Sequence, residues 1–124
     1  MRAAVAVVPR RGTPSLMFAV LYRWKLKPGT EPQFREAWKA ATGTIRARYK
    51  TGGSRLHRND DGELVAYAVW PSREAWVEAR KLPSTNPAAG AVMNACIEES
   101  FPTVFLEVVD DLLAPALTVS ALPA

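Results

Sequence analysis

The sequence predicts an α+β fold of the ferredoxin-like, split βαβ type, with a four-stranded antiparallel sheet and helices on one face of it. Segments of alternating apolar residues and segments with helical apolar spacing follow in the order strand, helix, strand, strand, helix, strand. The turn sequence Asn59-Asp60-Asp61-Gly62 joins two of these strands directly, as in a β-hairpin. The strand after this turn, residues 63–70, is apolar on both faces, which is typical of a sheet covered on both sides.

The first strand is expected over residues 16–27, because large apolar side chains alternate there with smaller or charged ones. A Pro-Gly pair ends it. Thr30 and Gln33 have the spacing of a capping box, so we expect a helix from Thr30 to about Lys50. One apolar stripe at helical spacing supports this helix: Phe34, Trp38, Ala41, Ile45 and Tyr49.

The second strand is expected over residues 54–58 and the third over residues 63–70. The length of the loop between them decides which sheet face His57 occupies. A three-residue loop pairs Leu56 with Ala66 on the helix side and turns His57 to the other face. A four-residue loop places His57 on the helix side, and the sequence leaves both alternatives open.

The second half of the chain predicts two more helices and the last strand. A serine N-cap begins the second helix, which is expected from Ser72 to about Leu82. An Asn-Pro pair then begins a short third helix, which we expect to end near Glu98. Residues 101–109 are rich in β-branched and aromatic side chains and predict the last strand.

The third strand also predicts a homodimer. Its alternation gives two apolar faces, one formed by Leu64, Ala66, Ala68 and Trp70 and the other by Val65, Tyr67 and Val69. The helices of one chain cover only the first face. Leu21 and Leu106 extend the second face, and the simplest cover for such a patch is a second copy of the chain.

Composition predicts one soluble globular domain, since 48% of the residues are hydrophobic and 23% are charged. We expect a flexible leader over residues 1–15, the folded domain over residues 16–113 and a tail over residues 114–124. One cysteine and one histidine exclude an intrachain disulfide and a metal centre built from several Cys or His ligands. A reducing, cytoplasmic setting without a metal is therefore the simplest interpretation.

Neither a membrane nor a nucleic acid is an expected partner. No apolar run approaches the roughly 20 residues of a membrane-spanning helix. The formal net charge is +4, but three of the basic residues lie in the leader and others surround the end of the first helix. Cations at a helix C-terminus interact favourably with the helix dipole, so this cluster has a structural explanation.

Aromatic residues mark the candidate site. Tyr22, Trp24 and Trp70 are expected to project from the sheet toward the helices, where Trp38 and Trp76 face them. Such a group either packs as a solid core or leaves a slot for a flat ligand, and the sequence favours neither.

Three polar side chains are candidates for chemistry beside these aromatic residues. His57 is the natural proton carrier, although a lone histidine on a strand more often has a structural or interface role. Arg55 and Arg80 could hold an anionic substrate oxygen, although solvated arginines are the ordinary case. Cys96 is interpreted as a small core residue. The sequence carries no Ser-His-Asp pattern, glycine-rich phosphate loop or paired-carboxylate motif.

The chain resembles the antibiotic biosynthesis monooxygenase (ABM) family over roughly residues 17–110. The resemblance depends on Leu26-Lys-Pro-Gly29 before the first helix and, above all, on the Trp70-Pro-Ser-Arg-Glu-Ala-Trp76 segment. It implies a dimeric α/β barrel with a pocket between sheet and helices in each subunit. It also implies either oxidation of polycyclic phenols to quinones without a cofactor or oxidative haem breakdown.

Some family positions are matched here and others are not. Trp70 matches the family tryptophan of the third strand, Trp76 the aromatic residue of the second helix and His57, approximately, a strand histidine. Quinone-forming members carry an asparagine where this chain has Ala66. Haem-degrading members need an asparagine and a histidine at the positions of Tyr22 and Arg80, so the resemblance disfavours haem breakdown.

Two functions follow as hypotheses. The first is a cofactor-independent monooxygenase that oxidises a small or polycyclic phenol with molecular oxygen. In it, Trp70 and His57 are the catalytic candidates, Arg55 is a second candidate for stabilising the phenolate, and the other aromatic residues with Ala66 and Arg80 form the substrate site. The second is a dimeric protein that binds a small aromatic molecule without converting it, or an accessory protein of the same fold, which Ala66 favours.

Overall fold

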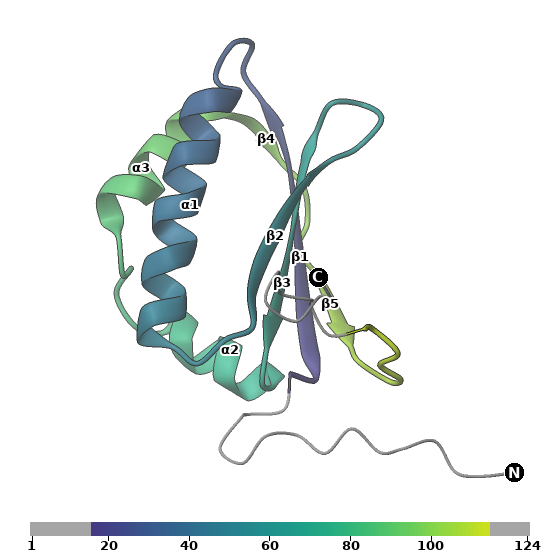
Figure 1. Cartoon of the computed structure of the whole chain (residues 1–124). Helices are drawn as coiled ribbons and strands as arrows, with labels where there is room; N and C mark the ends of the chain where they lie inside the picture. Colours follow the sequence, from purple (N-terminus) through teal and green to yellow (C-terminus); the bar gives the residue numbers. More distant parts are fainter. Residues whose placement is uncertain (1–15, 115–124) are drawn as a thin grey trace, which may run out of the picture.

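A computed structural model describes residues 16–114 of the chain (Figure 1). The expected leader, residues 1–15, and the tail from residue 115 onward lie outside these described residues. Three helices, α1 (Glu31–Arg48), α2 (Arg73–Arg80) and α3 (Pro87–Cys96), lie on one side of an antiparallel sheet. This arrangement confirms the predicted ferredoxin-like α+β class.

The sheet contains five strands: β1 (Phe18–Leu26), β2 (Gly53–Arg58), β3 (Leu64–Trp70), β4 (Ile97–Ser100) and β5 (Val104–Glu107). Their order is β2-β3-β1-β4, and β5 also pairs with β1. The two central strands pair from Phe18↔Trp70 to Trp24↔Leu64. Phe18, Tyr22, Trp24 and Trp70 therefore share the face that the helices cover, as the alternation predicts.

The last strand predicted over residues 101–109 is shorter in the structure, where it is β5 at Val104–Glu107, and a strand that was not predicted, β4, precedes it at Ile97–Ser100. β4 pairs with the end of β1, at Trp24↔Ser100, and β5 pairs with its start, at Phe18↔Glu107. Pro102 lies between the two strands, where it has no N–H to donate to the ladder.

The third helix ends at Cys96, earlier than predicted, because the next residues pair with β1 instead of continuing the helix. An ion pair between Lys25 Nζ and Glu98 Oε2 (3.1 Å) accompanies this pairing. The hydrogen bond that the Lys25 ammonium donates to the Glu98 carboxylate raises the pKa of Lys25.

The hairpin between β2 and β3 depends on the side chain of Asn59. Its Oδ1 accepts hydrogen bonds from the backbone N–H of Asp61 (3.1 Å) and of Glu63 (2.9 Å), and its Nδ2 donates to Glu63 Oε1 (2.9 Å). Gly62 has φ +80°, a value that residues with a Cβ rarely adopt. The resulting register pairs Leu56 with Ala66, as the three-residue-loop alternative requires.

We expect Asn59→Ala to lower the free energy of unfolding by about 1–2 kcal/mol, because three hydrogen bonds that define the turn are lost. Urea unfolding followed by tryptophan fluorescence measures this. Asp60→Ala, at the exposed neighbouring position, is the control and should leave the unfolding midpoint unchanged. Equal effects of the two substitutions would contradict this role for Asn59.

The helix starts are partly as predicted. Ser72 Oγ accepts from the N–H of Ala75 (3.0 Å), and Asn86 Oδ1 accepts from the N–H of Ala89 (3.1 Å), so both predicted N-caps are confirmed. The predicted capping box of α1 is wrong, because the side chain of Thr30 makes no cap hydrogen bond. Its hydroxyl instead donates to the carbonyl of Lys27 (2.7 Å), in the turn that leads from β1 into α1.

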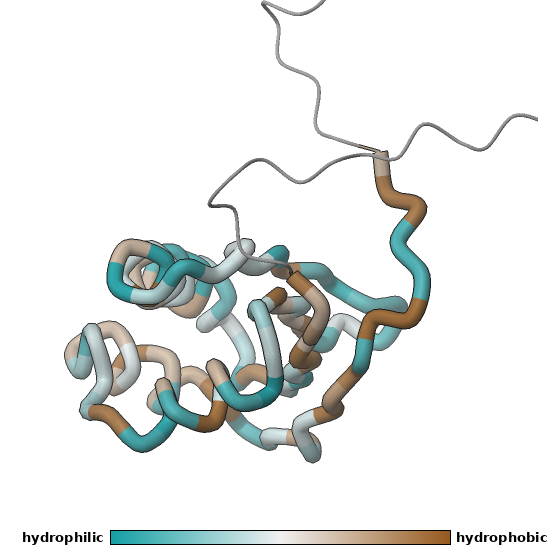
Figure 2. The backbone as a smooth tube through the Cα atoms, turned by 90° about the horizontal axis from the view of Figure 1, so that it is seen from below, coloured by the Kyte–Doolittle hydropathy of each residue, from teal (hydrophilic) through white to brown (hydrophobic). Residues whose placement is uncertain are grey.

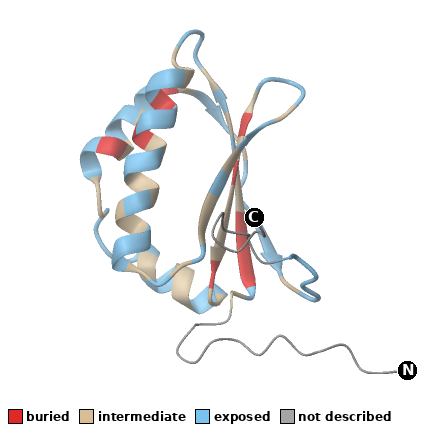
Figure 3. Ribbon diagram, viewed as in Figure 1, coloured by how far each residue is buried: buried red, intermediate tan, exposed pale blue. Residues whose placement is uncertain are grey.

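Two hydrophobic clusters hold the helices on the sheet. Phe18, Val20 and Trp70 centre the first, and Phe34, Leu64 and Cys96 centre the second. Figure 3 shows that the buried positions, in red, fall on the central strands and in the helix layer. Cys96 is 3% exposed, which agrees with its interpretation as a small core residue.

An ion pair joins the far end of the sheet to the helix layer. The Arg58 guanidinium, next to the hairpin, contacts the Glu31 carboxylate in the first turn of α1, with Arg58 Nε 3.2 Å from Glu31 Oε1. This hydrogen bond holds the pKa of the Glu31 carboxyl below its usual range.

The segment after β5 exposes several apolar side chains. Val109, Leu112 and Leu113 are 82%, 96% and 83% exposed. Figure 2 shows this segment running away from the helix layer, with hydrophobic stretches separated by hydrophilic ones. Within residues 16–114, no helix is long and apolar enough to cross a membrane.

Candidate functional site

A cavity of about 230 Å³ lies between the helix-covered face of the sheet and the helices. The structure therefore favours a slot over a solid core, the two alternatives that the sequence leaves open. Its lining residues come from every layer of the fold: Tyr22, Trp24, Trp38, Ala41, Thr42, Ile45, Thr51, Gly53, Ser54, Ala66, Ala68, Trp70, Arg80 and Met93.

Small residues at the centre of β3 make room for this cavity. Ala66 lies between Tyr22 of β1 and Leu56 of β2, and Ala68 lies between Val20 and Ser54. Both alanines share a face with Trp70, and a larger side chain at either position would extend toward α1. The two alanines, followed by Trp70 on the same face of β3, therefore form the floor of the slot.

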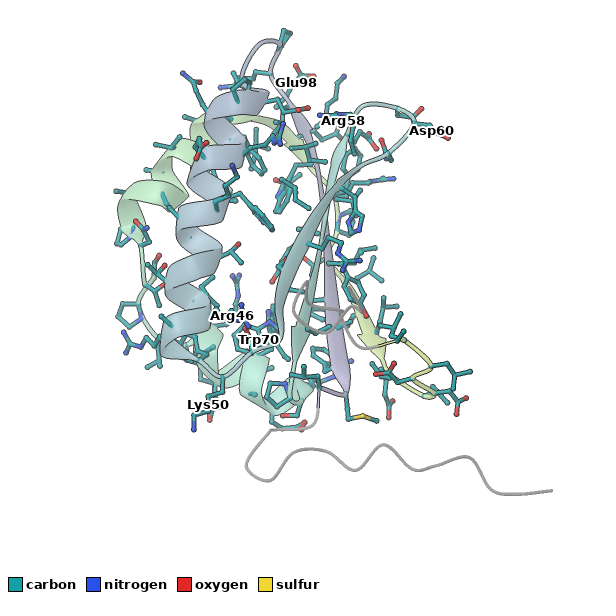
Figure 4. The ribbon with its side chains drawn as sticks, viewed as in Figure 1. Arg46, Lys50, Arg58, Asp60, Trp70 and Glu98 are labelled. Carbon is teal, nitrogen blue, oxygen red and sulfur yellow. The ribbon has the colours of Figure 1, made fainter. Side chains whose placement is uncertain are left out.

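A second cavity, of about 380 Å³, adjoins the first near α2 and the loop that follows it. Tyr22, Ala41, Ile45, Trp70 and Arg80 line both cavities. Figure 4 shows Trp70 at the end of β3, between the sheet and α1, whereas Arg58 and Asp60 lie around the hairpin at the opposite end. Trp70 and Tyr22 therefore lie on the wall that the two cavities share.

One hydrogen bond connects the aromatic residues of the site. Trp76 Nε1 donates to Tyr22 Oη at 3.0 Å. The Tyr22 ring stacks on Trp24, with centroids 5.7 Å apart and an interplanar angle of 4°. The guanidinium carbon of Arg80 lies 5.4 Å from the centroid of the Trp76 ring. These contacts fix the orientation of the Tyr22 hydroxyl at the boundary of the two cavities.

Most of the predicted site residues come together here. The first cavity is lined by Tyr22, Trp24, Trp38, Ala66, Trp70 and Arg80, and Trp76 lines the second. Met93 of α3 also lines the first cavity and was not among the predicted site residues; it follows the buried Ala89 by four residues and precedes the buried Cys96 by three. That helical spacing was the signal that could have identified it.

The structure does not bring His57 and Arg55 to this cavity. They pair with Val65 and Tyr67 on the other sheet face, and both are exposed. His57 Nδ1 lies 3.2 Å from the carbonyl oxygen of Val65. The four-residue-loop alternative, which would place His57 in the slot, is wrong, because Asn59 closes the shorter turn. The two residues instead border an open groove along the edge of β2.

The lining of both cavities is poor in charge. Arg80 is the one charged residue among the described residues that line them, and no Asp, Glu or His of residues 16–114 does so. The described residues also contain no group of three or more His, Cys, Asp or Glu side chains placed to hold a metal ion. The residues present can therefore enclose a flat apolar molecule and offer hydrogen-bond donors to one edge of it.

The solved structures that resemble this one share its fold. Rv0793 from Mycobacterium tuberculosis is 24% identical with a TM-score of 0.63, over 77% of this chain and 98% of that one. SnoaB, a cofactor-independent oxygenase from Streptomyces nogalater, is 18% identical with a TM-score of 0.64, over 79% and 98%. An asparagine-to-alanine mutant of SnoaB is 17% identical with a TM-score of 0.65, over the same shares.

Comparison with protein families gives a more specific result. No curated protein sequence matches the chain. Residues 17–86 match the family model described as antibiotic biosynthesis monooxygenase. This match covers more than half of the chain, including β1, β2, β3 and the aromatic residues that line the cavity. The protein therefore belongs to the antibiotic biosynthesis monooxygenase family.

Proposed function

We propose that this protein is a cofactor-independent monooxygenase that oxidises a small or polycyclic phenol with molecular oxygen in the cavity beside Trp70. The observation that carries the proposal is the cavity itself. It is lined by Trp24, Trp38 and Trp70 and opens beside the Tyr22 hydroxyl, in a chain of this family. Flat apolar walls with a few polar groups on one side suit an aromatic ring that carries oxygen.

The reaction needs little from the protein beyond binding and desolvation. The phenolate form of the substrate passes an electron to O₂, and the resulting radical and superoxide combine in a new C–O bond. Cleavage of the O–O bond then leaves one oxygen on the ring as a carbonyl and releases the other as water. The substrate loses two hydrogens and gains one oxygen, so O₂ is the only co-reactant. Trp70 holds the ring and O₂ together, since a positioned pair reacts as one unit.

Oxygen consumption tests the enzymatic function. We expect the purified protein to consume O₂ with anthrone-like or naphthol-like substrates and to release the corresponding quinone. Trp70→Phe should lower the rate on the order of tenfold, because the ring loses a contact surface and shifts within the cavity. An oxygen electrode measures the oxygen consumption, and product chromatography identifies the quinone. No oxygen uptake with any such substrate, or an unchanged rate in the variant, would exclude this activity.

Ala66 supports a second candidate function, the binding of an aromatic molecule without conversion. A methyl side chain on the cavity floor cannot hydrogen-bond a substrate or an oxygen intermediate. If the protein only binds its ligand, a phenolic compound should raise the melting temperature of the protein and be recovered chemically unchanged under air. Recovery of a quinone would decide for catalysis.

We also propose that the protein acts as a homodimer. Val65, Tyr67 and Val69 lie on the sheet face that the helices leave open, and each is only partly buried. In register with them, Val104 and Leu106 of β5 are 44% and 41% exposed. A second copy that packs against this face would remove these side chains from water.

A further inference from the structure

The cavities offer free hydrogen-bond donors but no base. Several hydroxyl groups that line them already have partners. Ser54 Oγ donates to the carbonyl of Tyr67 (2.9 Å), Thr51 Oγ1 accepts from the N–H of Gly53 (3.1 Å), and the Thr85 hydroxyl bonds with that of Thr44 (3.0 Å). Among the residues that line both cavities, Tyr22 carries a hydroxyl and Arg80 a guanidinium, and these groups can meet a ligand oxygen at the boundary.

The bond from Trp76 gives the Tyr22 hydroxyl a defined role. Because Trp76 Nε1 donates to Tyr22 Oη, the indole N–H occupies one of the two in-plane positions around this oxygen. The hydroxyl proton is directed to the other position, where it can be donated to a ligand. Accepting a hydrogen bond also strengthens a hydroxyl as a donor.

The charges around this boundary are positive or directed elsewhere. On α1, Arg46 lies beside Gly53 of the cavity lining. On α2, Glu78 pairs with Lys81, and Arg73 lies over the Phe18 and Phe105 rings. On β1, Arg23 and Lys25 pair with Glu63 and Glu98. The helix α3 carries no charged residue. None of these described groups is a carboxylate or an imidazole that lines the cavities.

From this arrangement we infer that the site selects hydroxyarenes that are already ionised, with the Tyr22 hydroxyl and the Arg80 guanidinium binding the substrate's O⁻. This inference rests on the proposed function and narrows its substrate to acidic phenols, such as those carrying a neighbouring carbonyl or another electron-withdrawing group. A donor hydroxyl and a guanidinium stabilise an anion, whereas a neutral phenol would find no base to accept its proton. The pKa of the ligand's hydroxyl then sets the pH dependence of binding, and no protein group does.

The test uses 4-nitrophenol, whose pKa lies near neutrality and whose anion absorbs visible light, together with 4-nitroanisole, its uncharged methyl ether. We expect nitrophenol affinity to rise about tenfold per pH unit until the pH reaches the phenol's own pKa, because only the anion binds. Bound nitrophenol should also show the anion spectrum below that pH. Nitroanisole binding should not change with pH. Binding of both ligands with equal affinity at all pH values would overturn the inference.

Substitutions identify the side chains that bind the phenolate oxygen. Tyr22→Phe should weaken nitrophenolate binding roughly tenfold or more, since a hydrogen bond to a charged oxygen is lost, and should weaken nitroanisole binding much less, since that ligand carries no charge. Arg80→Gln should weaken nitrophenolate binding by a smaller, several-fold amount, because the Arg80 guanidinium is exposed and solvent partly screens its charge. Tyr49→Phe, which removes a hydroxyl from the wall of the second cavity, is the matched control and should have no effect. Equal losses in Tyr49→Phe and Tyr22→Phe would overturn the assignment.

Binding and turnover separate this inference from the proposed function. If nitrophenolate binds as expected but no phenol is oxidised, the anion site stands and the oxygenase function fails. If phenols are oxidised, two substrates with different pKa values should give pH–rate profiles that are shifted along the pH axis by the difference between those two pKa values. One protein pKa common to all substrates would indicate a base on the enzyme and overturn the inference, while the oxygenase function would stand.

Discussion

Substituting Ala66 with phenylalanine should weaken ligand binding strongly while the fold persists. The new ring would project from the centre of β3 into the cavity of about 230 Å³. A bound aromatic ring would lose on the order of 100 Å² of apolar contact, about 2.5 kcal/mol, so its affinity should fall roughly 50- to 100-fold. Titration calorimetry with a phenolic ligand measures the affinity, and any oxygen consumption should fall in parallel.

The control for Ala66→Phe is Ala88→Phe, which adds the same ring to an exposed position of α3 outside this cavity. The control should bind ligand as the unmodified protein does. Melting temperatures of both variants establish that they are folded. Undiminished binding in a folded Ala66→Phe variant would show that ligands do not occupy this cavity.

A charge introduced at Val69 should separate the proposed dimer into monomers or unfold the chain. Val69 lies on the open sheet face, in register with Ala19 of β1 and Gly53 of β2. A carboxylate buried there without a partner costs about 3 kcal/mol or more, which raises the dissociation constant by roughly a hundredfold or more. Analytical ultracentrifugation of Val69→Asp measures this directly.

Val77→Asp is the matched control for Val69→Asp, because Val77 is 38% exposed on α2, away from the open sheet face. The unmodified protein and the control should sediment at about twice the 13.6 kDa mass of one chain. The Val69→Asp variant should sediment as a single chain or lose its helical signal. Sedimentation of the unmodified protein as a stable monomer would contradict the proposed dimer.

The sequence predicts the central part of the fold well because its signals there are local. Alternation assigns Tyr22, Trp24 and Trp70 to the helix-covered face, and each of them lines the cavity. The boundary between α3 and β4 is less predictable, since Ile97-Glu98-Glu99-Ser100 could extend the helix as easily as begin a strand. Pairing with β1, about 70 residues earlier in the chain, decides the outcome.

The site is only partly predictable for the same reason. The face that His57 occupies depends on the loop closed by Asn59, and alternation within a strand cannot decide the loop length. The bond between Trp76 and Tyr22 joins residues 54 positions apart, so no local pattern reveals it. The presence of a slot depends on the volumes of Ala66 and Ala68 against those of the facing helix residues, a property of packing in three dimensions.

The most direct measurement is a crystal structure of the protein soaked with an acidic hydroxyarene in the absence of oxygen, which prevents turnover. The ring should lie in the cavity against Trp70 and Trp38, with its oxygen within hydrogen-bond distance of the Tyr22 hydroxyl. A ring bound in the groove along β2, or a cavity that stays empty at saturating ligand, would contradict the function assigned to this site.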